Sequence, residues 1–303
     1  MKKLITLVIL LGIFALSLVY HDEISEFITE SFNTKNEASA LVKNDYTLDK
    51  DYEFAQTTDN FSPKTQEDIK NIYYTIIDSG MDNFVFYCDK NYKNCLDDVD
   101  YISNNQKLLS YMNNFAPVFN NFKNIETEFD SLGKVSINVT HSYSKEQIDA
   151  ISNKMDEIIK NNITTDMNAE AKIKTIHDYI INNTKYDIDR SDNKVTKYHS
   201  DNAYGALIEG YAICGGYADS MKLFLDYFDI PNFKISSENH IWNAVYLNDN
   251  WYHLDLTWDD PVTSTGEDIL EYNYFLITTD ELLELENEQH TFDIDIYNEL
   301  KEA

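Results

Sequence analysis

Positive charge is scarce in this sequence of 303 residues. Lysine and arginine together number 24, against 53 aspartates and glutamates, so the net charge is -29. A chain with this balance repels polyanions, which argues against nucleic-acid binding and against attraction to anionic lipid headgroups. The acidity itself has two interpretations, a solvated and soluble surface or a preference for cationic partners.

Glycine and cysteine are also few, with 8 and 3 residues. No glycine-rich phosphate loop is present, so nucleotide chemistry has no support in the sequence. No Cys-x-x-Cys pair occurs and the histidines lack a metal-ligand spacing near cysteines, so no metal site is predicted. Cys88 and Cys95 are close enough to pair in an oxidising compartment, which would leave Cys214 free. The alternative is that all three cysteines are unpaired apolar residues.

The N-terminus places Met1-Lys2-Lys3 before an apolar run from Leu4 to Tyr20, and acidic residues follow. Basic residues before such a run indicate that the bulk of the chain is exported. The run has the length of a short membrane-spanning helix or of a long signal-peptide core. We favour an uncleaved anchor in the cell membrane, because the cleavage pattern Ala15-Leu16-Ser17 lies inside the run. Secretion after signal cleavage is the alternative.

The rest of the chain divides into three parts after the anchor or signal at 1–22: a polar tether at 23–50, a small α+β module at 51–162 and a larger domain at 163–303. In the module we expect a helix that opens at Ser62-Pro63 and ends at Gly80, and strands at 84–88 and 134–141. Residues 104–112 are expected to be helical, while 113–129 are compatible with loop or strand.

Two further helices flank the predicted boundary near residue 163. Ser144 and Gln147 form a capping box, and the apolar stripe that follows predicts a helix ending near Asn162. A second helix is expected to begin at Thr165 or Asp166.

Three residues of the larger domain have the chemistry of a catalytic triad: Cys214, His240 and Asp255. Cysteine acyl transfer needs a thiolate, a base and a group that orients the base. An apolar stripe from Tyr217 to Phe228 predicts a buried helix that begins at Cys214, where the helix dipole favours a thiolate by about 0.3 to 1 kcal/mol. The glycines that follow, at 215 and 216, would allow a substrate backbone to approach closely.

The relative positions of His240 and Asp255 depend on the register of a predicted hairpin. Strand-like runs at 240–247 and 251–257 are joined by Asn248-Asp249-Asn250. A two-residue turn at Asn248-Asp249 makes Asp255 a diagonal neighbour of His240, about 7 Å away at the backbone. A three-residue turn would put the two side chains on opposite faces of the hairpin.

Each residue of the triad also has a structural interpretation. A lone buried cysteine is usually inert, and a strand histidine is more often a core or surface residue than a base. The combination of all three favours catalysis. His177 and His253 are interpreted as structural, with His253 as the more credible rival base.

These motifs resemble the transglutaminase-like superfamily of cysteine acyltransferases and peptidases, in its bacterial membrane-anchored form. The similar segments lie between about residues 165 and 280 and include Cys-Gly-Gly-Tyr-Ala at 214–218, His-Ile-Trp-Asn at 240–243 and Trp-Tyr-His-Leu-Asp-Leu-Thr-Trp-Asp-Asp-Pro at 251–261. The resemblance implies that Cys214 is the nucleophile, His240 the general base and acid, and Asp255 the group that orients His240. No calcium loop is recognisable, and no cofactor is expected.

The expected fold is therefore α+β, with a papain-like or transglutaminase-like core in which the cysteine helix packs on an antiparallel sheet carrying His240 and Asp255. The Cys214 backbone N–H is a natural oxyanion donor. Tyr204 is a candidate second donor, with a core aromatic as the alternative, and Trp242, Asn243 and Trp258 are expected to shape the site or hold the hairpin.

The expected activity is acyl transfer from an amide or glutamine carboxamide of a protein or peptide, at the cell surface or cell wall. The alternative is a non-catalytic surface binding or adhesion module that retains the fold.

Overall fold

The computed structural model describes residues 20, 37–48, 50–262 and 269–302. Contacts divide the chain into two units, residues 1–38 and 39–303. The predicted anchor or signal belongs to the first unit and, apart from Tyr20, lies outside the described residues. Among the residues that are described, none of the helices combines the length and the apolarity that a membrane span requires.

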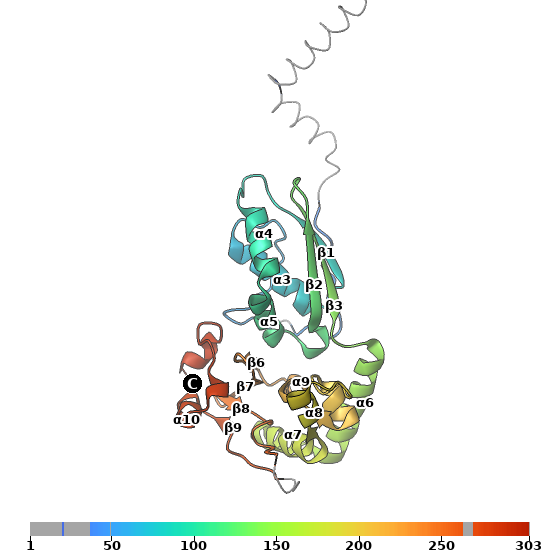
Figure 1. Cartoon of the computed structure of the whole chain (residues 1–303), viewed down its shortest axis with the longest axis vertical. Helices are drawn as coiled ribbons and strands as arrows, with labels where there is room; N and C mark the ends of the chain where they lie inside the picture. The colour runs from blue at the N-terminus through green and yellow to red at the C-terminus, as the bar shows by residue number, and fades with distance from the viewer. Residues whose placement is uncertain (1–19, 21–36, 49, 263–268, 303) are drawn as a thin grey trace, which may run out of the picture. The chain divides into compact units, whose positions relative to one another are not determined.

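The second unit begins with an antiparallel sheet of strand order β1-β3-β2, beside which three helices lie (Figure 1). Buried Val135, Ile137 and Val139 alternate with polar residues along β3, as predicted. The elements are α3 (Gln66–Ser79), β1 (Asn83–Tyr87), α4 (Cys95–Asn104), α5 (Gln106–Phe115), η1 (Val118–Asn120), β2 (Phe122–Phe129) and β3 (Lys134–His141).

Helix α3 begins later than predicted. Thr65, not Ser62, is the N-cap, and it forms a capping box with Asp68. The Asp68 carboxylate also accepts the backbone N–H of Lys64, so the chain enters the helix only after Thr65. The helix ends at Gly80 in a left-handed conformation (φ 68°), as predicted.

The last part of the predicted tether is bound to this module. The Ser39 N–H donates to the Val85 carbonyl at 2.8 Å, and the Val85 N–H donates to the Ser39 hydroxyl at 3.0 Å. The Asn44 N–H donates to the Ser79 carbonyl at 3.1 Å. The part of the predicted tether from Ser39 to Asn44 is therefore bound to the folded module, because its polar groups pair with β1 and α3.

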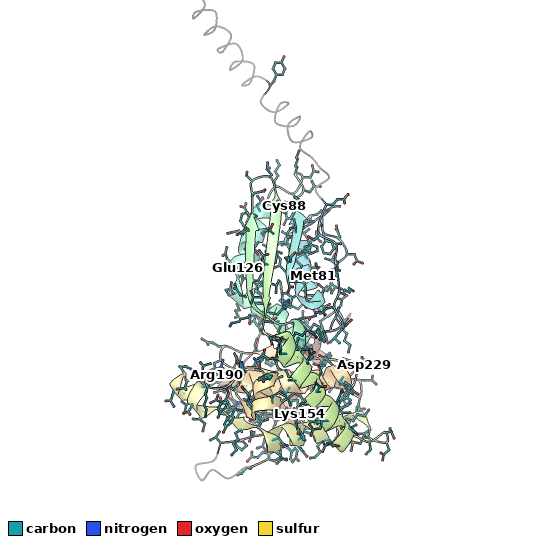
Figure 2. The ribbon with its side chains drawn as sticks, turned by 90° about the vertical axis from the view of Figure 1, so that its right-hand side faces the viewer. Met81, Cys88, Glu126, Lys154, Arg190 and Asp229 are labelled. Carbon is teal, nitrogen blue, oxygen red and sulfur yellow. A yellow bond between two sulfur atoms is a disulfide. The ribbon has the colours of Figure 1, made fainter. Side chains whose placement is uncertain are left out.

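Cys88 and Cys95 form a disulfide with a Cα–Cα distance of 5.8 Å. It joins the residue after β1 to the first residue of α4, at one end of the β1-β3-β2 sheet (Figure 2). The third cysteine of the sequence, Cys214, is a free thiol.

The C-terminal half of the unit packs helices α6, α7 and α9 around one apolar core, and α9 lies on an antiparallel sheet of order β6-β7-β8-β9. The predicted α+β class is confirmed. The elements are α6 (Lys145–Asn162), α7 (Ala169–Asn183), β4 (Lys185–Tyr186), α8 (Ile188–Asn193), η2 (Gly205–Glu209), β5 (Tyr211–Ala212), α9 (Cys214–Tyr227), β6 (Asn232–Ser236), β7 (Ile241–Leu247), β8 (Asn250–Leu254), β9 (Phe275–Ile277), α10 (Thr279–Glu284), η3 (Glu288–His290) and η4 (Asn298–Glu302).

Two helix starts in this half test the sequence patterns. The capping box of Ser144 and Gln147 is present, and α6 ends at Asn162 as predicted. Helix α7 begins later than predicted, because the Asn168 side chain caps it by accepting the Ala171 N–H. The predicted domain boundary near residue 163 lies between α6 and α7, inside the second unit, and stays a prediction.

Candidate active site

Cys214 is the first residue of helix α9, as predicted, and its side chain is partly exposed. The N-cap residue, Ile213, makes no side-chain capping hydrogen bond, and the N–H of Gly216 donates to the Ile213 carbonyl at 2.9 Å; no side chain among the described residues accepts from the N–H of Cys214 or Gly215. Such groups point at whatever lies beyond the helix start and favour negative charge there. The helix is held in place by a buried face that includes Tyr217, Met221 and Phe224.

The two glycines after Cys214 are required by the packing of the chain, and the expectation that they also admit a substrate backbone stays a prediction. A Cβ at Gly215 would lie 2.7 Å from the carbonyl oxygen of Asp201, and one at Gly216 would lie 2.6 Å from that of Ser200. The Ile213 N–H also donates to the Ser200 carbonyl at 2.7 Å. Glycine is required here because residues 200–202 lie directly against the start of α9.

The β7–β8 hairpin has the predicted register. Leu247 pairs with Asn250, and the turn residues Asn248 and Asp249 have φ values of 52° and 63°. Two consecutive left-handed residues are typical of a type I′ turn, which Asn and Asp tolerate. The two-residue turn brings Asp255 and His240 to the same face of the sheet.

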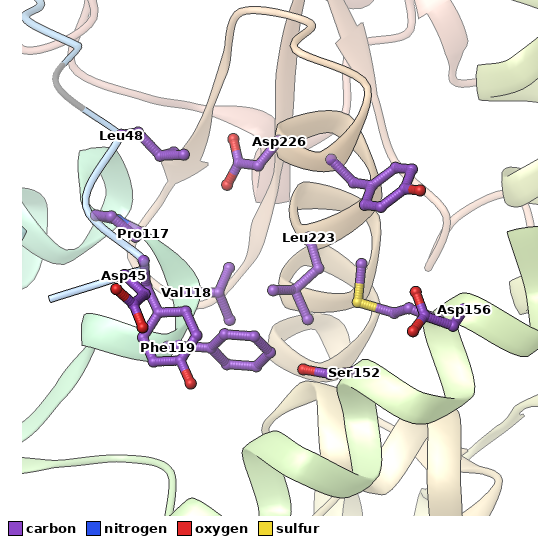
Figure 3. Close-up of a pocket in the computed structure, with 12 residues that line it drawn as sticks. Asp45, Leu48, Pro117, Val118, Phe119, Ser152, Asp156, Leu223 and Asp226 are labelled. Carbon is purple, nitrogen blue, oxygen red and sulfur yellow. The ribbon is translucent and has the colours of Figure 1, made fainter.

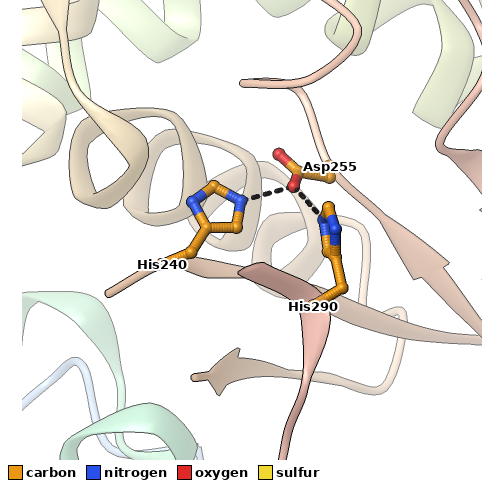
Figure 4. A group of neighbouring side chains, drawn as sticks. All are labelled: His240, Asp255 and His290. Atoms are coloured by element: carbon orange, nitrogen blue, oxygen red, sulfur yellow. Dashed lines mark hydrogen bonds and ion pairs between the residues drawn. The ribbon is translucent and has the colours of Figure 1, made fainter. Parts of the chain in front are cut away.

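His240 and Asp255 are buried and joined by a hydrogen bond of 2.5 Å between Nε2 and Oδ2 (Figure 4). A carboxylate only accepts, so Nε2 carries the proton and Nδ1 is the nitrogen left for Cys214. Burial lowers the pKa of His240, but the charge and hydrogen bond of Asp255 and an interaction with the Cys214 side chain outweigh it and raise the pKa to about 10. An imidazolium held beside a thiol stabilises the thiolate.

The other carboxylate oxygen of Asp255 is fixed by the backbone. Oδ1 accepts the N–H of Thr257 at 2.9 Å and that of Trp258 at 3.3 Å. Burial raises the pKa of Asp255, but the charges and hydrogen bonds of His240 and His290 outweigh it and hold the pKa below its usual range. Asp255 therefore remains an anion that can orient His240.

His290 is the residue of this site that the sequence analysis missed. Its Nε2 donates to the same Asp255 oxygen at 2.8 Å, from η3, and its side chain is buried (Figure 4). Its ring packs edge-on against Trp242 and stacks on Tyr274, with centroid distances of 4.8 Å in both cases. Asp255 thus accepts from two imidazoles, and no local motif in the sequence marks the second one.

His240, Asp255 and His290 are also residue types that bind metal ions, and their ligand atoms lie within 4.8 Å of one another. Their separations of 2.5 and 2.8 Å are hydrogen-bond lengths. Ligands about 2.0 to 2.2 Å from a tetrahedral zinc ion lie more than about 3 Å apart. The cluster is therefore spaced for shared protons.

Two tryptophans and an asparagine predicted for this region have different roles. Trp242 covers one face of His240, with ring centroids 5.7 Å apart and nearly parallel planes. Trp258 is exposed at the edge of the site, 5.8 Å from the ring of His290. Asn243 donates to the Ala218 carbonyl at 3.0 Å, so it holds the hairpin against α9.

Tyr204 is not brought to Cys214 by any contact among the described residues. Its ring packs edge-on against His199 with a centroid distance of 5.4 Å, and it lies against the apolar core. The aromatic packing role is thus the one that the structure favours. The backbone N–H of Cys214 stays the oxyanion donor that we predict.

His253, the rival base, has both ring nitrogens engaged. Nδ1 accepts the Trp242 indole N–H at 3.0 Å, and Nε2 is 3.1 Å from the Thr279 hydroxyl. Burial, together with the neighbouring His290, lowers the pKa of His253 to about 3. A histidine that stays neutral and fully bonded fits the structural role that we predict.

Two clefts open beside the start of α9. One of about 330 Å³ is lined by Cys214, Asn239 and α8 residues that include Arg190. The other, of about 560 Å³, shares Arg190 and reaches Gly215 and Ile241. A separate cavity of about 310 Å³ involves Leu223 and Asp226 of α9 and contains no residue of the triad (Figure 3).

The comparisons with known proteins agree with the motifs. Residues 156–256 match the model of the transglutaminase-like superfamily, and this segment contains Cys214, His240 and Asp255. The predicted resemblance is thereby confirmed for that segment. No curated protein matches the chain.

Two solved structures are similar in part. A TGase crystal structure has 13% identity and a TM-score of 0.34, over 55% of this chain and 61% of that chain. A candidate cysteine protease from Cytophaga hutchinsonii has 17% identity and a TM-score of 0.28, over 48% of this chain and 65% of that chain. This chain therefore spans less than two thirds of the length of either one.

Proposed function

We propose that the chain is a cysteine acyl-transfer enzyme that acts on amide or glutamine carboxamide groups of proteins or peptides. The observation that carries the proposal is the buried His240, which bonds to Asp255 through Nε2 at 2.5 Å and interacts with the Cys214 side chain. A thiol, a base beside it and a group that orients the base are what cysteine acyl transfer requires.

In the proposed reaction the Cys214 thiolate attacks the carbonyl carbon, and the backbone N–H of Cys214 stabilises the oxyanion. The C–N bond then breaks, and the leaving ammonia or amine takes a proton from the His240 imidazolium. The resulting thioester is attacked by water or by an amine, which gives its proton to His240 and restores the Cys214 thiolate. Hydrolysis and transamidation differ only in this last acceptor.

We also propose that the enzyme acts outside the cytoplasm, anchored by the segment Leu4–Tyr20 or secreted after its removal. The sequence of that segment and the Cys88–Cys95 disulfide support this placement, because disulfides persist in oxidising compartments. The cell-surface or cell-wall nature of the substrate is part of the same proposal.

The direct test uses the Cys214 thiol, which is the free one of the three cysteines. Iodoacetamide at neutral pH should label the wild type rapidly and the His240→Ala variant slowly, and Cys214→Ala should not be labelled. Ammonia release from glutaminyl peptides, with and without an added amine, should depend on Cys214. Slow labelling of the wild type, equal to that of a free cysteine peptide, would argue for the non-catalytic binding or adhesion module.

A further inference from the structure

Basic side chains gather around the two clefts beside Cys214. Their walls hold five basic residues and two acidic ones, namely Lys123, Arg190, Lys194, Lys197 and Lys234 against Asp201 and Asp219. In the whole sequence, acidic residues outnumber basic ones by 53 to 24. The residues that line these clefts thus reverse the charge balance of the chain.

Two of the five basic residues are neutralised within the clefts. Arg190 Nη2 lies 2.7 Å from Asp201 Oδ2, and Lys234 Nζ lies 2.5 Å from Asp219 Oδ1. These two pairs account for both carboxylates of the cleft walls. They contribute structure and leave the remaining charge positive.

The other three lysines supply that charge. Lys123, Lys194 and Lys197 are exposed, and no carboxylate in the described part of the chain lies within ion-pair distance of them. Lys194 Nζ donates to the Ser191 carbonyl at 2.9 Å, and Lys197 Nζ lies 4.7 Å from the centroid of the Tyr198 ring. Both contacts orient an ammonium group without neutralising it.

The cavity that Leu223 and Asp226 line shows that positive walls are not general in this chain. It contains Asp45, Asp156 and Asp226 and no lysine or arginine (Figure 3). That composition follows the overall acidity, so the clefts at Cys214 depart from it. Their positive charge therefore calls for a ligand of opposite sign.

We propose that these clefts bind an acidic segment of the substrate, so that the preferred acyl donor carries aspartate or glutamate beside its reactive amide or glutamine. This inference rests on the proposed acyl transfer at Cys214, because that reaction would place the reactive amide at the thiol and the acidic residues in the clefts. A long polyanion would also meet the repulsion of the -29 net charge. A short acidic segment senses mainly the lysines within a Debye length of about 8 to 10 Å.

The test measures binding without requiring turnover. The full-length Cys214→Ala protein, in nonionic detergent, is titrated into fluorescent peptides of equal length with a central glutamine flanked by Asp/Glu, by Ser/Asn or by Lys. The acidic peptide is expected to bind about tenfold more tightly than the neutral one at low ionic strength, and the advantage should shrink as salt is added. The lysine peptide should bind most weakly.

Charge reversal then assigns the preference to the clefts. The double variant Lys194→Glu and Lys197→Glu should lose the preference for the acidic peptide, while Lys64→Glu, an exposed lysine before α3 that lines neither cleft, should keep it. Circular dichroism of each variant checks that it is folded. Retention of the preference in the double variant would contradict the proposal.

Two further outcomes overturn the inference. One is equal binding of the three peptides, and the other is binding of a ten-nucleotide oligothymidylate as tight as that of the acidic peptide. Either result leaves the proposed acyl transfer intact if the wild type still turns over glutaminyl peptides. Conversely, selective binding of the acidic peptide with no Cys214-dependent turnover would support acidic-peptide binding in the clefts and contradict the proposed acyl transfer.

Discussion

The buried aspartates Asp255 and Asp259 of the described residues each bond to a histidine, and only the His240–Asp255 pair adjoins a thiol. His240 bonds to Asp255 through Nε2, and its other nitrogen is left for Cys214. His177 has both nitrogens engaged by carboxylates, since Nε2 lies 3.1 Å from Asp259 and Nδ1 lies 3.0 Å from Asp178. The same two residue types thus form a site that can exchange a proton and a pair that only ties elements together.

The difference lies in what surrounds each ring. The His177 ring packs against both Tyr272 and Phe275, with centroids 5.5 and 5.0 Å away, so it links α7 to the segment around β9. Burial raises the pKa of Asp259, although His177 and the Tyr274 N–H lower it. Burial and a carboxylate partner are therefore insufficient to define a catalytic histidine; the third partner decides.

The largest expected effect contrasts the two aspartates. Asp255→Asn removes the anion that orients His240, and we expect a loss of about 10³-fold or more in turnover of a glutaminyl peptide. Asp259→Asn, the matched change at the other pair, should leave turnover of the folded protein within about threefold. Steady-state kinetics on both variants measure this. Equal losses would remove the distinction between the two pairs.

The residues of the candidate active site could be predicted from the sequence to different degrees. Cys214 at a helix start and the register of His240 with Asp255 follow from local signals, an apolar stripe after Gly215-Gly216 and an Asn-Asp turn. A two-residue turn fixes every cross-strand pair, but Asn248-Asp249-Asn250 also allowed a three-residue turn, and the structure decides between them.

His290 was not predictable because nothing local constrains it. It lies 35 residues beyond Asp255, in the short η3 turn, and reaches the carboxylate only through tertiary packing. The start of helix α4 was likewise not predicted, and its N-cap residue Asn94 makes no side-chain capping hydrogen bond. The charge of the clefts likewise comes from segments as distant as β2 and the residues after α8.

A smaller effect tests whether His290 acts through Asp255. His290→Phe keeps a ring but removes the donor to Asp255, and we expect about a tenfold loss of kcat. With one donor fewer on the Asp255 carboxylate, the pKa of His240 should rise, which shifts the limb of the pH–rate profile that reports His240 to higher pH. His290→Gln restores an N–H and should recover most of both properties. An unchanged pH profile in His290→Phe would mean that His290 is only a packing residue.

A substitution at the His177–Asp259 pair should lower the stability of the protein and leave its activity unchanged. His177→Phe leaves the Asp259 carboxylate buried without its imidazole partner, and we expect a loss of about 1 to 3 kcal/mol in the free energy of unfolding. Urea denaturation measures it, and activity per folded molecule should stay within about twofold. His199→Gln, at an exposed histidine, is the control and should be near neutral. A large loss of activity in His177→Phe would show that this pair also serves the reaction.

The smallest effect is a pH dependence of stability that belongs to His240. Its pKa is about 10 in the folded protein and 6.5 ordinarily, so the stabilisation from its protonated form is complete below about pH 6.5 and is lost as the pH rises through 10. Asp255 contributes no change in this window, because a lowered carboxyl pKa matters only in acid. The Tm difference between wild type and His240→Gln should therefore be greater at pH 6 than at pH 10, by about 2 to 4 °C for each kcal/mol lost. A Tm difference that is constant between these two pH values would mean that His240 is not held as an imidazolium beside Asp255 and Cys214.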